Sequence, residues 1–419
     1  MSRRPLYGLY AANGVSITGN ILTVLAVPWF VLQTTGSATR TGIAAAASTL
    51  PIMLSGAFSG TFADRIGHRR ASIVSDVVSS AIVLLVPVLH ATVGIEFWQL
   101  LTLVFLRSLF ATPGETARGA LLPDLAERSG VQLERATAGY DAIARGARMV
   151  GAPVAGVMIA LIGAPNLLVL DAATYLVSAL LVWRYVPRPR AKAARERSPY
   201  LVDLRVGLGY VRRMPLVRNV VVLCMLTNML DAGMGAVLMP LYAREVLGTP
   251  VALGAVMGVS GGAAVAGALA FGAWGSRRER RRLFVVSYLL CGVPRFAVLA
   301  LQAPLWVIVA TFALSGFASG PLNPIMDTSM LERLPEELRA RVFGVVYAGC
   351  TAAMPVGGVL AGAAAGTIGL TGALWAFGAV YLVTTLWPAL TGSWAGLDRQ
   401  VLPPLPSPVT ATGAANQVG

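Results

Sequence analysis

Charged side chains lie within stretches of this sequence that are otherwise apolar enough to cross a membrane. Arg107, Asp231 and Arg295 each lie near the middle of such a stretch. On insertion scales, an arginine or aspartate at the bilayer centre costs roughly 2.5 to 3.5 kcal/mol unless a cavity or a partner compensates. A carboxyl group in a low-dielectric cavity has its ionised form disfavoured, so it can exchange a proton with either side of a membrane. We therefore expect Asp231 to bind a proton or a cationic substrate.

Several polar residues of these stretches are candidates for contacts between helices. For Arg107, pairing with a carbonyl or acid of another helix and a role in substrate binding or coupling are equally favoured. For Arg295, a structural role is favoured. Asp171 is expected to make packing pairs between helices, as is the set Asp141, Arg145 and Arg148. Asn13, Asn20 and Asn228 add amide groups to the same kind of stretch.

The composition identifies the class of protein that must position these residues. The 419 residues are 56% hydrophobic and only 12% charged, with a mean hydropathy of +0.70. A spanning helix needs about 20 mostly apolar residues. We count twelve such segments, which predicts an all-α membrane protein with twelve transmembrane helices. The segments are 7–32, 41–62, 71–93, 97–116, 139–161, 166–183, 219–243, 251–274, 284–301, 305–326, 342–368 and 373–390.

The distribution of basic residues predicts the orientation. A net charge of +14 is typical of nucleic-acid-binding proteins as well. Nearly all of the 33 Lys and Arg residues, however, fall in the termini and the even-numbered connections, and only Arg40 and Arg244 fall on the other side. The positive-inside rule then places both termini in the cytoplasm. We expect a lipid bilayer as surroundings and no nucleic-acid partner.

Other residue types argue against a metal site, a cofactor and an ATPase. Cys224, Cys291 and Cys350 all fall in predicted helices, so we expect inert buried thiols and no disulfide framework. Only two histidines are present, which predicts no metal. The single lysine, Lys192, has no glycine-rich loop before it, so no P-loop is present. No set of nucleophile, base and metal indicates an enzyme, and we predict none.

The two halves of the chain repeat a pattern. Ala152-Pro153-Val154-Ala155-Gly156 matches Met354-Pro355-Val356-Gly357-Gly358, and the Gly and basic run after the second segment has a degraded copy after the eighth. A parallel repeat of this kind predicts two pseudo-symmetric six-helix bundles. We expect bundles at 1–186 and 216–392. A basic cytoplasmic linker at 187–215 joins them, either solvated or forming an amphipathic helix over 200–213, and a disordered cytoplasmic tail follows at 393–419.

The stretch GTFADRIGHRR carries a resemblance to a known family. Its pattern Gly60-x-x-x-Asp64-Arg65-x-Gly67-x-Arg69-Arg70 resembles motif A of the major facilitator superfamily, where the motif lies between helices 2 and 3 and helps to lock the cytoplasmic side. A plain stop-transfer loop is the alternative interpretation, and the twelve segments and the repeat make it less favoured. His68 replaces the usual basic residue.

A second motif lies in the fifth segment. Gly151-Ala152-Pro153-Val154-Ala155-Gly156 is similar to motif C, which the family associates with antiporters, with Ala-Pro in place of Gly-Pro. Helix packing with a kink is about equally favoured. TPGETARGALLPDL (112–125) and LLVLDAATYLVSALLV (167–182) resemble the branch of enterobactin exporters and macrolide-efflux proteins.

The resemblance implies a function and a site. Helices 1, 4, 7 and 10 usually line the central cavity of the superfamily, which makes candidates of Asn13, Asn20, Arg107, Asn228 and Asp231. The resemblance implies a monomeric, proton-coupled secondary transporter of the bacterial cytoplasmic membrane. It would export a small amphiphilic molecule, such as a drug, secondary metabolite or siderophore, by alternating access. Uptake is the nearest alternative, and a receptor or assembly partner that transports nothing is the alternative from another class.

Overall fold

The computed structural model describes residues 3–188, 200–274, 279–334, 336–390 and 394. Within these residues the regular structure is helical, and no β-strand is present. The all-α class is therefore confirmed for the described part of the chain. The tail expected at 393–419, apart from Trp394, and the linker residues 189–199 lie outside the described residues.

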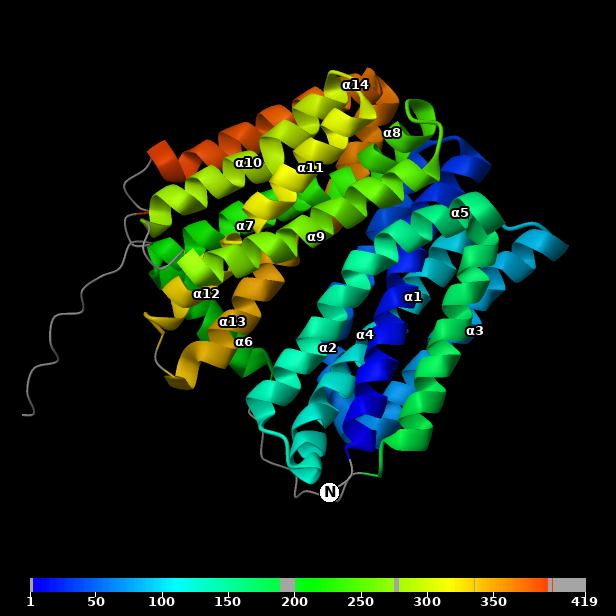
Figure 1. The fold of residues 1–419 in the computed structure, drawn as a ribbon, viewed down its shortest axis with the longest axis vertical. Coiled ribbons are helices and arrows are strands. Elements are labelled where there is room, and N and C mark those ends of the chain that lie inside the picture. Colours follow the sequence, from blue (N-terminus) through cyan, green and yellow to red (C-terminus); the bar gives the residue numbers. More distant parts are fainter. Residues whose placement is uncertain (1–2, 189–199, 275–278, 335, 391–393, 395–419) are drawn as a thin grey trace, which may run out of the picture.

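Figure 1 shows the helices in chain order, and the first half of the chain (3–188) forms five of them. These are α1 (Arg4–Thr35), α2 (Ala38–Ile66), α3 (His68–Thr92), α4 (Phe97–Ser129) and α5 (Leu133–Tyr185). The second half (200–394) continues with shorter elements. These are α6 (Tyr200–Arg213), α7 (Pro215–Gly233), a π-helical segment (Met234–Leu238), α8 (Met239–Glu245), α9 (Pro250–Trp274), α10 (Arg280–Ala300), α11 (Leu305–Ser319), α12 (Leu322–Leu331), α13 (Glu336–Thr351) and α14 (Met354–Leu390).

Local sequence signals set several helix ends. Gly36 ends α1 with φ +64°, a left-handed conformation that glycine adopts without a Cβ penalty, and its N–H bonds to the carbonyl of Leu32. Ser37 then starts α2, because its hydroxyl accepts a hydrogen bond from the backbone N–H of Arg40 at 3.2 Å. Glu96 and Gln99 form a reciprocal capping box at the start of α4.

Two of the long helices contain a break that the sequence analysis placed between separate spans. Gly163 has φ +81° within α5, and Gly369 has φ +75° within α14. Each of these glycines connects two helical segments, and Figure 1 shows the chain reversing direction within α5. Gly320-Pro321 separates α11 from α12 inside one predicted span, where the proline lacks the N–H that a continuous helix would use.

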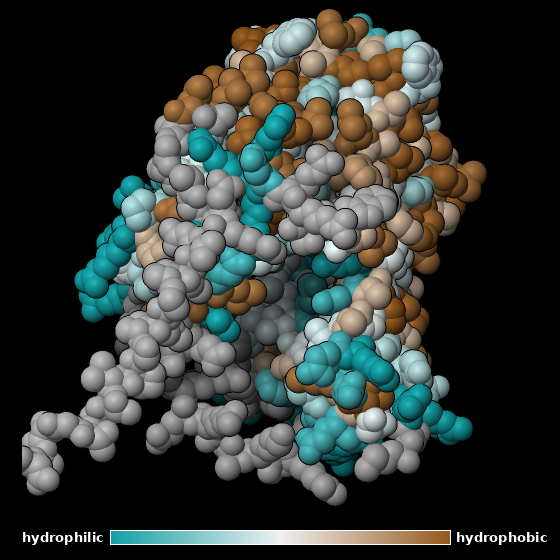
Figure 2. Space-filling model, turned by 60° about the vertical axis from the view of Figure 1, so that its left-hand side comes forward, coloured by the Kyte–Doolittle hydropathy of each residue, from teal (hydrophilic) through white to brown (hydrophobic). Residues whose placement is uncertain are grey.

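Eight helices of the described structure are long and apolar enough to cross a membrane. Two of them, 133–185 and 342–388, are the ones that contain the glycine breaks. Large apolar side chains such as Leu161, Leu269 and Val383 are more than two-thirds exposed. Exposed apolar side chains in this number are typical of a lipid-facing surface, and Figure 2 shows them as extensive brown areas on the outside.

The helices of each half pack mainly among themselves. In the first half α1 packs on α5, and α3 and α4 pack on each other; in the second half α9 packs on α11, and α14 packs on α7 and α10. Contacts between the halves are concentrated in two helix pairs, α2 with α14 and α5 with α9. Figure 1 shows the two groups of helices meeting near α8 and diverging toward the end that carries the N-terminus and α6.

Glycines allow the backbones of the two halves to touch. A Cβ atom on Gly156 of α5 would lie 2.7 Å from the carbonyl oxygen of Pro250 and 2.8 Å from Cα of Gly254, both on α9. A Cβ on Gly42 of α2 would lie 2.3 Å from the carbonyl oxygen of Gly358 on α14. Because any side chain would clash at these distances, glycine is required for this close approach.

A polar contact also joins the halves at the end near α8. Nη1 of Arg244 donates a hydrogen bond of 2.6 Å to the backbone carbonyl of Leu32, in the last turn of α1. At the opposite end the molecule is hollowed between the two groups of helices, and Figure 2 shows hydrophilic residues around this opening. The structure is thus closed at one end and open at the other.

Candidate functional site

The structure pairs two of the three charged residues that the sequence places in mid-span. Nη2 of Arg295 on α10 lies 2.6 Å from Oδ1 of Asp231 on α7. The Asp231 side chain is 34% exposed and that of Arg295 is 15% exposed, so the carboxylate is the more accessible member of the pair. Two helices distant in sequence therefore bring opposite charges together in the second half.

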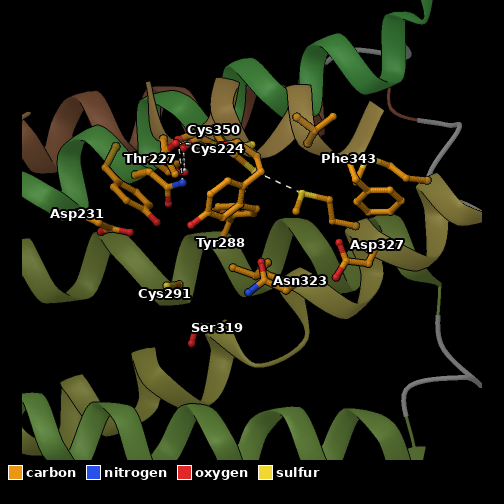
Figure 3. Close-up of a pocket in the computed structure, with 18 residues that line it drawn as sticks. Cys224, Thr227, Asp231, Tyr288, Cys291, Ser319, Asn323, Asp327, Phe343 and Cys350 are labelled. Carbon is orange, nitrogen blue, oxygen red and sulfur yellow. Dashed lines mark hydrogen bonds between the residues drawn. The ribbon is translucent and has the colours of Figure 1, made fainter. Parts of the chain in front are cut away.

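Asp231 lines a cavity of about 390 Å³ in the second half, which we call the second-half cavity. Figure 3 shows Asp231, Tyr288, Cys224 and Cys350 gathered around this space, with Asn323 and Asp327 across it. The volume is within the range of small-molecule sites. Its lining side chains include Cys224, Thr227, Asn228, Asp231, Tyr288, Cys291, Ser319, Asn323, Met326, Asp327, Phe343, Tyr347, Cys350, Thr351 and Tyr381.

Two predicted features of the second half lie around this cavity. The amide Nδ2 of Asn228 donates a hydrogen bond of 3.0 Å to the carbonyl of Cys350, so this residue holds α7 against α13. The three cysteines are free and buried, and all of them line the cavity. The sulfur of Cys224 lies 3.3 Å from the hydroxyl of Tyr288.

Arg107 lies in a different setting, inside the first half. Its guanidinium donates to Oδ1 of Asn20 through both terminal nitrogens, at 3.1 and 3.0 Å, and to the Tyr175 hydroxyl at 3.1 Å. Oδ2 of Asp171 lies 3.8 Å from it and also accepts a hydrogen bond from Thr23. The side chains of Arg107 and Asp171 are only 8% and 0% exposed. We call Asn20, Thr23, Arg107, Asp171 and Tyr175 the first-half cluster.

A second buried ion pair in the first half was missed by the sequence analysis. Arg118 on α4 lies 2.9 Å from both oxygens of Asp76 on α3 and also donates to the hydroxyl of Ser16 at 2.9 Å. Ser178 donates to the same carboxylate at 2.7 Å. The fourth predicted span ends at residue 116, and the charge of Arg118, two residues farther on, was the signal that could have indicated this pair.

Asn13 also lies inside the first half. Its side chain is fully buried and accepts a hydrogen bond of 2.8 Å from the Tyr140 hydroxyl on α5. Of the five candidate cavity residues, Asn228 and Asp231 thus lie in the second-half cavity. Asn13, Asn20 and Arg107 are engaged with other helices of the first half.

The residues of the motif A pattern lie at the junction of α2 and α3. Gly67 has φ +86°, the conformation that the tight turn requires. Arg69 donates to the carbonyls of Val186 and Trp183 at 2.7 and 2.6 Å, and so caps the C-terminal end of α5. Arg65 and Arg70 are exposed. Gly60 and Asp64 lie in α2, but their surroundings lie outside the described residues.

The residues of the motif C pattern lie where the two halves meet. Pro153 packs under Gly258 of α9, where a Cβ would lie 2.1 Å from the proline ring. Gly156 contacts Gly254, as described above, and Gly151 faces Ile21 of α1. These contacts account for the small residues by close packing between helices.

One acidic residue of the cavity was not among the predicted residues. Asp327 on α12 lines the second-half cavity but lies one residue beyond the predicted end of the tenth span, at residue 326.

Within the described residues, no group of three or more His, Cys, Asp and Glu side chains could hold a metal ion.

Comparison with known proteins identifies the family. The model of the major facilitator family described as "Transmembrane secretion effector" matches residues 3–392. The chain belongs to this family. It is accordingly a membrane transporter of the efflux branch that the sequence motifs resembled, and not an enzyme. It is a multi-pass protein of the bacterial plasma membrane.

Individual relatives and solved structures agree with this family. The multidrug efflux pump Tap of Mycolicibacterium fortuitum is 33% identical over 375 residues, which cover 88% of this chain and 91% of the relative. Macrolide efflux protein A of Streptococcus pyogenes is 20% identical, over 87% of this chain and 90% of that protein. The nucleoside transporter NupG shares the fold at a TM-score of 0.73 and 13% identity, over 96% of this chain and 100% of that one.

Proposed function

We propose that the protein exports small amphiphilic drugs or related metabolites from the cytoplasm in exchange for protons. The observation that carries this proposal is the Asp231–Arg295 pair, whose carboxylate is 34% exposed and lines a cavity among helices long enough to span a membrane. The printed names of the relatives, multidrug efflux pump and macrolide efflux protein, support export over uptake.

We further propose the arrangement in which this pair works. Twelve spans form two six-helix bundles, at 1–186 and 216–392, with both termini in the cytoplasm. Breaks at Gly163 and Gly369, and the continuous run through α7, the π-helical segment and α8, support this count. The basic linker at 187–215 would lie at the cytoplasmic face, with α6 on the membrane surface, and the protein would act as a monomer. In this orientation the open end of the molecule faces the cytoplasm.

The ion pair offers a physical basis for coupling. With Asp231 ionised, the carboxylate attracts the Arg295 guanidinium and ties α7 to α10. A proton on Asp231 removes the negative charge, so the attraction that holds this pair is lost and the cavity wall gains freedom to rearrange. Proton binding from outside and substrate binding from inside would then favour different arrangements of the two bundles.

Transport in cells tests the proposal. The wild type and Asp231→Asn would be expressed in an efflux-deficient bacterium, and accumulation of ethidium and of a macrolide panel measured with and without a protonophore. We expect lower accumulation with the wild type, which both the protonophore and Asp231→Asn abolish. Asp124→Asn is the matched control, because this carboxylate pairs with Arg128 on the same helix, away from the cavity, at 2.9 Å.

Other outcomes would overturn the proposal in distinct ways. Raised accumulation would show uptake, and protonophore-insensitive export would exclude proton coupling. Unchanged accumulation for every compound, together with no flux in purified proteoliposomes, would favour the receptor or assembly role.

A further inference from the structure

Asp327 is a carboxylate without a partner in the second-half cavity. It lies on α12 and is exposed to this space, and Figure 3 shows its carboxylate across from the Asp231 side of the cavity. No hydrogen bond or salt bridge to Asp327 occurs within the described residues. Asp231, in contrast, is paired with Arg295 at 2.6 Å.

The charge of the cavity therefore rests on Asp327. The charges of Asp231 and Arg295 compensate each other, and the remaining lining residues are neutral side chains. A carboxylate in such a low-dielectric space attracts a cation more strongly than one in water does. A ligand that balances this charge would carry one positive charge.

The walls of the cavity indicate an organic cation and not a metal ion. Tyr288, Phe343, Tyr347 and Tyr381 supply aromatic rings, and Met326 adds a thioether. Aromatic faces attract organic cations, and a thioether adapts to ligands of different shape. A volume of about 390 Å³ holds a molecule of drug size and exceeds what a bare ion would need.

Asp327 also borders a second chamber, which lies between the halves. This chamber, of about 410 Å³, shares Ser319, Asn323 and Asp327 with the second-half cavity and adds apolar residues of α9. Arg145 of α5 lines its first-half side. A cation in this chamber would be repelled by Arg145 and attracted by Asp327, so the electrostatic field directs it toward the second half.

We propose that Asp327 is the counter-ion for the positively charged group of an amphiphilic organic cation carried by this protein. The inference rests on the proposed export function and names its substrate class. Asp231 and Arg295 then serve coupling, whereas Asp327 serves recognition. The aromatic residues of the cavity hold the apolar part of the same ligand.

Binding to purified protein tests this assignment without requiring transport. Tetraphenylphosphonium and tetraphenylborate have nearly the same shape and opposite charge, and their binding to the full chain in lipid nanodiscs can be measured by equilibrium dialysis. We expect the wild type to bind the cation and to discriminate against the anion. Asp327→Asn should weaken binding of the cation about tenfold, because the variant removes the opposite charge, and Asp327→Glu should restore most of it.

The control variants separate charge recognition from general effects. Glu134→Gln neutralises an exposed carboxylate in the first turn of α5 and should leave cation binding unchanged. Thermal unfolding of each variant would confirm that it is folded. Equal binding of both ions by the wild type, or unchanged cation binding in a folded Asp327→Asn, would overturn the inference.

This result is independent of the export test. If drugs are exported but the phosphonium cation is not bound, the assignment of Asp327 is wrong and the export function stands. If the cation is bound through Asp327 but no compound is transported, the site is real and the exporter proposal is wrong.

Discussion

Arg107 and Asp171 in the first half lie 3.8 Å apart with almost no exposure, whereas Asp231 and Arg295 in the second half lie 2.6 Å apart at the wall of a cavity. In the first-half cluster Asn20 and Tyr175 accept hydrogen bonds from Arg107, and Thr23 donates one to Asp171. The second-half pair has fewer partners and more contact with solvent. A charge pair of the first kind holds helices together, whereas the carboxylate of the second pair is accessible from the cavity.

The largest effect is expected where a buried charge loses its partner. Arg118→Met would leave the Asp76 carboxylate, which is fully buried, without its cation. Breaking such a pair costs about 3–5 kcal/mol of stability. Thermal unfolding in detergent should show a large loss for Arg118→Met, and the double variant with Asp76→Leu should recover much of it. Equal stability of the single variant and the wild type would contradict a structural role for the Arg118–Asp76 pair.

A functional effect with little loss of stability is expected in the second half. Asp231→Asn keeps the side-chain shape and removes a charge that is already 34% exposed. Partly exposed pairs contribute at most about 1 kcal/mol, so the unfolding temperature should change little. Proton-driven efflux in proteoliposomes should nevertheless fall at least about tenfold, which corresponds to about 1.4 kcal/mol. If Asp231→Asn unfolds as readily as Arg118→Met, the contrast between a structural charge pair in the first half and a functional one in the second half is wrong.

Lysine substitutions compare the geometry of the two arginines. Arg107 uses two nitrogens on Asn20 and one of them on Tyr175 as well, whereas Arg295 contacts Asp231 through one nitrogen. Because lysine has no planar fork, Arg107→Lys should destabilise the protein by about 1–2 kcal/mol. Arg295→Lys should retain most of the transport. The measurements are unfolding for the first variant and flux for the second, and the reverse pattern would contradict the comparison.

The smallest effect concerns two tyrosines at similar sequence positions. Tyr175-Leu176-Val177-Ser178 in α5 resembles Tyr381-Leu382-Val383-Thr384 in α14. The Tyr175 hydroxyl accepts from Arg107, whereas that of Tyr381 is buried without a nitrogen or oxygen partner among the described residues. Tyr175→Phe should therefore cost about 1 kcal/mol and Tyr381→Phe less than half of that. Unfolding of both variants in one detergent gives the difference directly, and equal losses would contradict it.

The sequence was sufficient for the fold class and for part of the site. Hydropathy identified the apolar helices, because spanning a membrane demands long apolar runs whatever the helices contact. Of the two interpretations left open for 200–213, a solvated linker and an amphipathic helix, the helix has the same bounds as α6. Arg107, Asp231 and Arg295 were singled out because a charge in an apolar run is costly without compensation.

The pairing of these charges could not be predicted from one sequence. Asp231 and Arg295 are joined only because α7 and α10 both pack on α14, which brings their side chains within reach of each other. Arg107 reaches Asp171 only because α4 lies near the second segment of α5. The hydropathy signal contains no information on which helices are neighbours. Arg118 and Asp327 were missed for another reason, since each lies one or two residues beyond a predicted span end, where boundaries are uncertain.

The glycine contacts between α5 and α9, and between α2 and α14, have a consequence for the kinetics of any movement of the halves. Gly156 and Gly254 meet backbone to backbone, with no side chain between these two residues. Because no side chain at this point has to move aside, the two helices can change their relative orientation without first separating. We therefore expect a low activation barrier for reorientation of the halves. A methyl group added at Gly156 would introduce a side chain into this contact. It would lower the turnover rate before it lowers the affinity for the substrate.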